Sequence, residues 1–112
     1  MVEPLRDEIP PGTLHLLILK ILARGPNHGY GIAQFVENSS REVFRVEEGS
    51  LYPALQRMLL KGWVKAEWQQ TENKRRARVY SLTALGRKQL EVELNKYRRV
   101  SHAIGRVIAA SS

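Results

Sequence analysis

The chain contains no cysteine among its 112 residues. Disulfide bonds, cysteine-ligated zinc and thiol catalysis are therefore excluded. Long hydrophobic runs are missing too, because His15 and Lys20 interrupt the longest apolar stretch, which is too short to span a bilayer. Residues 1–11 are acidic and broken by prolines, unlike a signal peptide. We therefore expect a cytoplasmic protein without a membrane segment.

Groups that could carry catalysis or hold a metal ion are sparse. The histidines His15, His28 and His102 lie far apart in the sequence, and none has the HExxH spacing of a zinc site. No glycine-rich phosphate loop follows a predicted strand. We thus predict no enzyme activity, no metal site and no cofactor.

The charge of the chain favours a polyanionic partner. Lysine and arginine number 18 against 11 acidic residues, which gives a formal net charge of +7. Nucleic acid is the first candidate for the partner and an anionic membrane surface the second. Hydrophobic residues make up 43% of the chain, enough for one folded domain with its own core.

Three helices are predicted in the first half of the chain, over residues 12–24, 29–39 and from Ser50, which can cap the third, to Gly62. Gly62 fits the left-handed position that ends a helix. The first helix is apolar nearly all round, since Leu16 and Leu19 lie off its main stripe, so it must be covered on more than one side. A second copy of the chain is the simplest cover, which is a first argument for a homodimer.

A β-hairpin is predicted next. Residues 63–70 and 78–82 alternate between apolar and polar side chains, with Tyr80 and Leu82 facing inward. Between them lies a long tip, residues 71–77. Four cations fall within six residues at this tip and its edge, in the run Asn73, Lys74, Arg75, Arg76, Ala77 and Arg78. Such a cluster can contact phosphates or enter a minor groove, and an ordinary solvated loop is the alternative.

A last helix is predicted from Thr83, which can cap it, to about Ala109. At about 1.5 Å per residue it would be roughly 40 Å long, too long to be covered by so small a domain. Its apolar residues follow a heptad pattern. We expect this seam to pack on a partner copy, through Leu90, Leu94, Tyr97, Val100, Ile104, Val107 and Ile108, with Leu16 and Leu19 contributing from the first helix.

The order of these elements predicts a winged helix-turn-helix. The fold class would be mainly α with a small β-hairpin (α+β), plus a long C-terminal dimerisation helix. Its parts would be a flexible arm at 1–11, a DNA-binding domain at 12–82 and the dimerisation helix at 83–112. The polar face of the third helix could reach base edges or phosphates, through Ser50, Tyr52, Pro53, Gln56, Arg57 and Lys61, with Ala54 also placed outward.

Several blocks of the sequence resemble the PadR family of bacterial transcriptional regulators. They are GTL at 12–14, HGYGI at 28–32, GSLYPALQRM at 49–58, GWV at 62–64 and RVYSLTALG at 78–86, and the resemblance covers about residues 12–90. It implies a winged-helix dimer that binds an inverted-repeat operator, usually as a repressor. The implied DNA contacts are Tyr30, Ser50, Tyr52, Pro53, Lys74, Arg75 and Arg76. Some members release DNA when they bind phenolic or drug-like aromatics, so the resemblance also allows for a small aromatic effector.

Two other functions remain open from the sequence. The fold could be a protein–protein module whose basic wing docks an acidic partner, or a small enzyme or ligand carrier that uses a dimer cleft. Trp63 and Trp68 are predicted to lie in the core or on the flank of the hairpin, with stacking on an aromatic ligand as the alternative.

Overall fold

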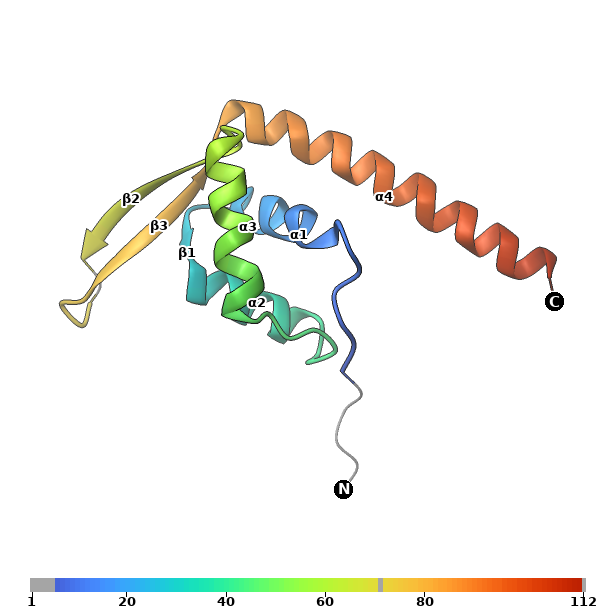
Figure 1. The fold of residues 1–112 in the computed structure, drawn as a ribbon, viewed down its shortest axis with the longest axis horizontal. Coiled ribbons are helices and arrows are strands. Elements are labelled where there is room, and N and C mark those ends of the chain that lie inside the picture. Colours follow the sequence, from blue (N-terminus) through green and yellow to red (C-terminus); the bar gives the residue numbers. More distant parts are fainter. Residues whose placement is uncertain (1–5, 71, 112) are drawn as a thin grey trace, which may run out of the picture.

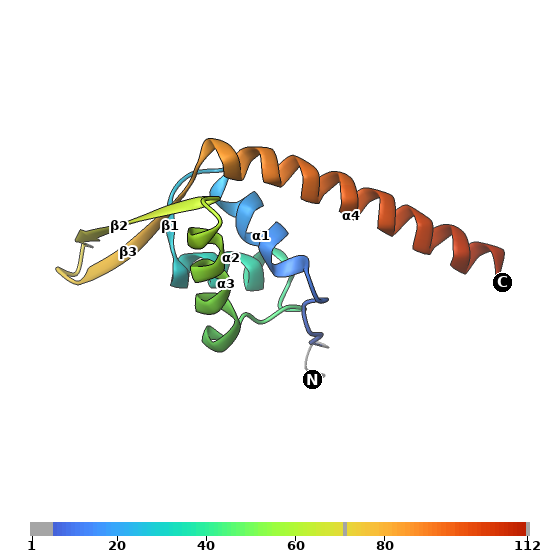
Figure 2. The same ribbon diagram turned by 45° about the horizontal axis from the view of Figure 1, so that its top comes forward.

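The computed structural model describes residues 6–70 and 72–111. In chain order the elements are α1 (Thr13–Leu22), β1 (Asn27–His28), α2 (Gly29–Ser39), α3 (Glu48–Leu60), β2 (Val64–Gln70), β3 (Arg76–Leu82) and α4 (Ala84–Ala110). Helices α1, α2 and α3 form a central group, from which the β2–β3 hairpin and α4 project in opposite directions (Figures 1 and 2). The predicted α+β class is confirmed, since the described residues form four helices and a three-stranded antiparallel sheet.

Helix α1 is the centre of the hydrophobic core. It contacts α2, α3, α4 and β3 within the same chain. These elements bury Leu16, Ile18, Leu19, Ile21 and Leu22, whereas Leu14 and Leu17 are only partly buried. The largest fully buried side chains are Ile18, Leu19, Leu22, Ile32, Leu51, Leu55 and Met58.

This core corrects part of the predicted dimer interface. Leu16, Leu19 and Leu90 were expected to pack on a second copy, but all three are buried inside a single chain. The reason is that α4 and the sheet cover the side of α1 that the three-helix arrangement leaves open. The apolar character of α1 is therefore no argument for a dimer.

Helix α3 begins two residues earlier than predicted. Glu47 precedes it without a side-chain cap, and the N–H of Ser50 donates to the carbonyl of Glu47, so Ser50 lies inside the first turn instead of capping it. Pro53 consequently lies beyond the first turn, in the interior of α3. Ala54, expected to face outward, is fully buried against the core.

The sheet contains a strand that the sequence did not predict. Asn27 and His28, which lie between the first two predicted helices, form β1 and pair with Tyr80 and Val79 of β3, so the sheet order is β1-β3-β2. Strand β3 begins at Arg76, which pairs with Gln70. Arg76, Ala77 and Arg78 are therefore strand residues, and the hairpin tip is shorter than predicted; Thr71 lies outside the described residues.

A tight corner joins α3, β2 and α4. Gly62 ends α3 with φ of 75°, as predicted. Thr83 caps α4, as predicted, because its hydroxyl oxygen accepts from the N–H of Gly86 at 3.0 Å. The same hydroxyl group donates to the carbonyl of Gly62 at 2.6 Å and lies 3.0 Å from that of Trp63.

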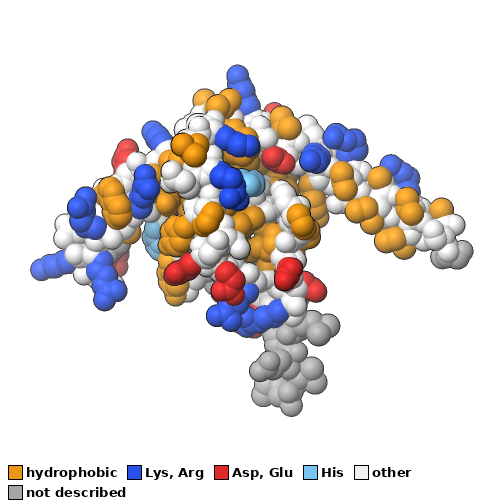
Figure 3. All heavy atoms as spheres, in the orientation of Figure 1, with side chains coloured by type: hydrophobic (Ala, Val, Ile, Leu, Met, Phe, Trp, Pro, Cys, Tyr) orange, Lys and Arg blue, Asp and Glu red, His pale blue; other side chains and the backbone are white. Residues whose placement is uncertain are grey.

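Only the first part of α4 packs on its own chain. Leu90 is buried and Leu94 is partly buried against the core. Further along, the apolar side chains are exposed, and Figure 3 shows them along the projecting half of the helix. They are Tyr97, Val100, Ile104, Val107 and Ile108.

The N-terminal segment makes two contacts with the domain in its described part. The N–H of Asp7 donates to the carbonyl of Val43 at 2.8 Å, within an isolated parallel bridge to Phe44. Ile9 packs against the core. Residues 1–5 of the predicted arm lie outside the described residues. Across residues 6–70 and 72–111, none of the helices combines the length and the apolar character that crossing a membrane requires.

The corner generates a stability prediction. A β-carbon at Gly86 would collide with the carbonyl of Trp63 and lie 2.8 Å from Leu82, so Gly86→Ala should lower the free energy of unfolding by at least about 2 kcal/mol. Gly49→Ala is the matched control, since nothing lies within 4 Å of its new carbon and the helix should gain up to about 1 kcal/mol. Urea unfolding measures both changes. Equal stabilities for the two variants would contradict the close approach at this corner.

Candidate nucleic-acid interface

One face of α3 is free of contacts with the core. The side chains predicted to contact DNA are exposed on it, and α3 lies at the front of the molecule in the orientation of Figure 3. They are Ser50, Tyr52, Pro53, Gln56, Arg57 and Lys61. Helix α3 has 13 residues and is thus about 20 Å long at ~1.5 Å per residue, a size that a DNA major groove admits.

The start of α2 lies beside this face. His28 caps α2, because its Nδ1 accepts from the N–H of Gly31 at 3.0 Å, and its ring stacks on Tyr30 with centroids 6.3 Å apart. The hydroxyl of Tyr30 accepts from Gln34 Nε2 at 2.8 Å. These two contacts orient Tyr30, which remains 65% exposed.

Tyr52 bridges α3 and α2 by close approach. A β-carbon at Gly29 would lie only 2.8 Å from the Tyr52 hydroxyl oxygen. The absence of a side chain at Gly29 therefore lets the Tyr52 ring lie against the start of α2. Although held in this way, Tyr52 is 45% exposed and available to a partner.

The hairpin provides the cationic part of the interface. Asn73, Lys74 and Arg75 lie at its exposed tip, where Lys74 has a left-handed φ of 58°. Arg76 and Arg78 lie on β3. Lysine and arginine side chains lie along the hairpin in Figure 3.

A hollow of about 680 Å³ lies at the edge of the candidate interface, and several of the residues that line it are acidic. Tyr30 and Tyr52 line it together with carboxylates and two arginines, among which Arg45 and Glu47 form an ion pair at 3.6 Å. The other charged residues of this hollow are Arg6, Glu37 and Glu48. A polyanion should be repelled from these carboxylates, so they mark one edge of the candidate interface.

The predicted site residues lie in different regions of the structure. Tyr30, Tyr52, Arg76 and Arg78 line one cleft together. Lys61 lies elsewhere, at the end of α3, where its ammonium is 4.7 Å from the ring centroid of Trp63. The other described residues that line the cleft were not predicted as site residues: His28, Gly29, Trp68, Ala77 and Tyr80. Sequence periodicity gives no signal for them, because the cleft forms only when the hairpin folds beside α2.

Behind α3, His15 of α1 is a partly buried imidazole. Its ring meets the Trp63 ring edge-on with centroids 6.1 Å apart, and its Nε2 is buried without a hydrogen-bond partner in the described part of the chain. Burial lowers the pKa of His15 below 6.5, and Arg57 and Lys61 lower the pKa further, while Glu93 of α4 acts in the opposite direction. His15 is therefore mainly neutral in the folded protein at neutral pH.

A three-helix core followed by a two-stranded wing defines the winged helix-turn-helix class. The chain belongs to the transcriptional regulator PadR-like family, whose model matches residues 18–92. Its overall fold is similar to that of a PadR family transcription regulator from Clostridium difficile, with a TM-score of 0.74 and 29% identity over 87% of this chain and 99% of the other. It is also similar to a transcriptional regulator from Clostridium thermocellum, with a TM-score of 0.78 and 25% identity over 85% of this chain and 92% of the other. The protein is thus a winged-helix regulator of the DNA-binding type.

Two curated relatives have no described function. An uncharacterised protein X of Lysinibacillus sphaericus is 26% identical over 99 residues, which are 88% of this chain and 91% of the relative. An uncharacterised 37.1 kDa protein in a transposon of Streptomyces fradiae is 40% identical over 96 residues. That match covers 86% of this chain but only 25% of the transposon protein.

The environment of His15 predicts a pH dependence of stability. The unfolded chain binds a proton at His15 near pH 6.5, whereas the folded chain does so only at lower pH. The free energy of unfolding should therefore fall as the pH is lowered through 6.5 and level off below the folded-state pKa. Urea unfolding between about pH 5 and pH 8 should show this fall in the wild type and a smaller one in His15→Phe.

The control is His102→Gln, since His102 is exposed on α4. This variant should keep the wild-type dependence on pH. An unchanged pH profile in His15→Phe would show that His15 does not contribute to it.

Proposed function

We propose that the protein is a sequence-specific duplex DNA-binding repressor that binds an inverted-repeat operator as a homodimer in the cytoplasm. The observation that carries the proposal is the exposed polar face of α3 beside a cationic hairpin. Membership of a family of transcriptional regulators supports it.

In this proposal α3 enters the major groove. Tyr52, Gln56 and Arg57 have side chains that can contact base edges, whereas Ser50 and Tyr30 lie nearer the helix starts and suit phosphate contacts. Pro53 has no side-chain donor or acceptor, so its part is close approach to the groove. The hairpin cations contact phosphates on the flank, through Lys74, Arg75, Arg76 and Arg78, and the side-chain amide of Asn73 can donate a hydrogen bond there as well.

The projecting half of α4 supports the homodimer in this proposal. Its exposed apolar residues follow the heptad pattern, and water-exposed apolar stripes of this kind are covered by a partner helix. To bind an inverted repeat in successive major grooves, a twofold pair would have to hold its two α3 helices about 34 Å apart. Repression then requires only that the dimer occupy the operator, while activation would need a further surface for polymerase.

The first test of this function is fluorescence anisotropy with the duplex upstream of the protein's own gene, against a scrambled duplex. We expect selectivity of ~10³ or more at physiological salt. Replacing Lys74, Arg75 and Arg76 by alanine should weaken binding to both duplexes and reduce the salt slope by about 0.9 for each lost phosphate contact. Arg57→Ala should instead reduce the selectivity.

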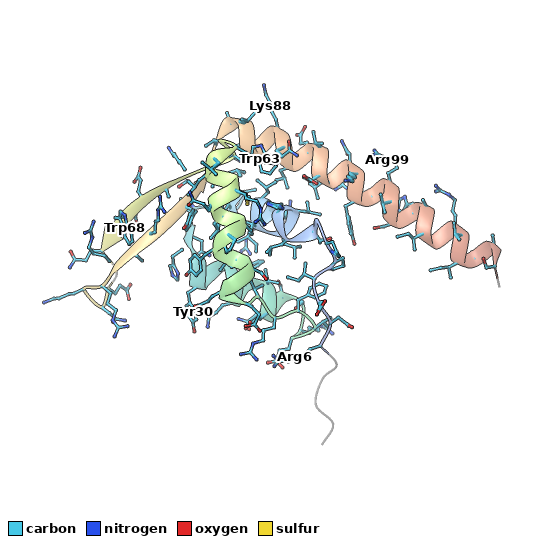
Figure 4. All side chains as sticks on the ribbon, in the orientation of Figure 1. Arg6, Tyr30, Trp63, Trp68, Lys88 and Arg99 are labelled. Atoms are coloured by element: carbon cyan, nitrogen blue, oxygen red, sulfur yellow. The ribbon has the colours of Figure 1, made fainter. Side chains whose placement is uncertain are left out.

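The matched control replaces Lys88, Lys96 and Arg99 of α4 by alanine and so removes the same charge. Lys88 and Arg99 lie on the side of α4 that faces away from the core (Figure 4). This control should leave the salt slope nearly unchanged. If both triple variants lost affinity equally, net charge and not the hairpin would determine binding, and absence of binding to either duplex would favour a protein partner.

The dimer is tested by a charge on the α4 seam. Ile104→Lys should raise the dimer dissociation constant by at least about 100-fold, because an unpaired ammonium would have to be buried. Val92→Lys is the matched control, since Val92 is exposed on the same helix but lies off the heptad seam. Sedimentation equilibrium measures both constants. A wild-type dimer that Ile104→Lys leaves intact would place the interface elsewhere.

A further inference from the structure

A cleft of about 450 Å³ lies between the hairpin, the start of α2 and the side of α3 that carries Tyr52. Figure 4 shows Tyr30 and Trp68 on the hairpin side of α3, from two different elements. The lining is mostly aromatic and cationic: His28, Gly29, Tyr30, Tyr52, Trp68, Arg76, Ala77, Arg78 and Tyr80. The floor of the cleft is Tyr80, whose burial raises its phenol pKa above 10.0 while Arg78 acts in the opposite direction.

The pairing of the hairpin explains why Trp68 faces this cleft. Directly paired residues point to the same face of a sheet, and alternate residues share a face. Ala66 pairs with Tyr80 and both pack in the core, so Trp68 and its partner Arg78 continue the same face outward. Beyond the edge of the helices this face has no core to cover it, and Trp68 is 60% exposed.

The arginines of the cleft are held against its aromatic rings. The Arg76 guanidinium lies 5.3 Å from the Trp68 ring centroid, and the Arg78 guanidinium lies 5.9 Å from that of Tyr80. Such cation–π contacts use the guanidinium faces, and Arg78 also hydrogen-bonds Tyr80. A guanidinium has five N–H donors, so both arginines retain donors that can bind oxygen anions. None of the residues that line the cleft is a carboxylate, in contrast to the hollow on the other side of Tyr52.

We propose that this cleft holds one deoxyribose–phosphate unit of the DNA backbone, with the sugar against Trp68 and Tyr52 and the phosphate at Arg76 and Arg78. The inference rests on the proposed DNA-binding function and adds Trp68 as a DNA-contact residue. If α3 occupies the major groove and the hairpin tip reaches the flanking minor groove, the strand that separates the two grooves must pass between α3 and the hairpin. The cleft lies at that point.

The chain contains two tryptophans, which makes the proposal directly measurable. Trp63→Phe leaves Trp68 as the single indole. Acrylamide quenching of its fluorescence is then compared with and without a saturating random-sequence duplex of about 30 base pairs at low salt, where non-specific binding is strong. A random duplex suffices because the proposed contact is to the backbone. We expect bound DNA to lower the quenching constant of Trp68 several-fold, since a 60% exposed ring becomes covered.

Variants on the two faces of β2 provide the second measurement. Trp68→Ala should weaken binding to specific and random duplexes alike by roughly tenfold, because a large apolar side chain that the sugar covers in the complex is lost, and Trp68→Phe should restore most of it. Gln69→Ala is the matched control, because Gln69 is exposed on the opposite face of the same strand and should have no effect.

The outcomes separate this inference from the proposed function. If anisotropy shows that DNA is bound while the quenching of Trp68 is unchanged, the cleft is not a backbone site, although the protein still binds DNA. Shielding of Trp68 by salicylate but not by DNA would assign the cleft to a small aromatic anion and overturn the proposal. No DNA binding at all would overturn both the function and the cleft assignment.

Discussion

The architecture outside the core depends on the corner at which Thr83 meets the end of α3. One hydroxyl group lies within hydrogen-bonding distance of two backbone carbonyls, Gly62 and Trp63, and accepts from the N–H of Gly86. The backbone N–H of Thr83 also donates to the carbonyl of Trp63 at 3.0 Å. The direction of α3, the start of the hairpin and the axis of α4 are therefore fixed relative to one another within a few residues. If α3 reads DNA and α4 forms the proposed dimer, such a joint is needed to make the separation of the two α3 helices definite.

The sequence alone predicted those elements whose signals lie in neighbouring residues. Apolar periodicity, Gly62 and Thr83 predicted the helices and their ends, and alternation predicted the inward side of β3. The sequence was not sufficient for β1, which has only two residues and exists because β3 supplies its partners. The start of α3 was misplaced because Glu47 provides no side-chain cap, so the strongest capping residue nearby, Ser50, gave a misleading signal.

For the site too, the sequence predicted what depends on neighbouring residues but not what depends on tertiary contacts. Exposed cations at the hairpin and polar residues on α3 could be predicted from their spacing. The burial of Leu16, Leu19 and Leu90 could not, because one-dimensional patterns do not distinguish an apolar face covered by the same chain from one covered by another copy. The position of Trp68 in the lining of the cleft could not be predicted either. Alternation places this aromatic side chain on the inward face of the strand, but the sequence does not show how far the strand extends beyond the helices that cover that face.

Helix α4 is one uninterrupted helix of 27 residues, Ala84–Ala110, which contains both Gly86 at the corner and Ile104 in the exposed seam. Each residue turns an α-helix by about 100°. Leu90 is anchored in the core, and Tyr97 is the first exposed residue of the seam. If two copies pair along the seam, the number of residues between these two positions determines the angle by which the α3 faces of the two copies are rotated relative to each other. The insertion of a single residue into this part of α4 would then change which pairs of half-sites the proposed dimer can span, without changing any residue that touches DNA.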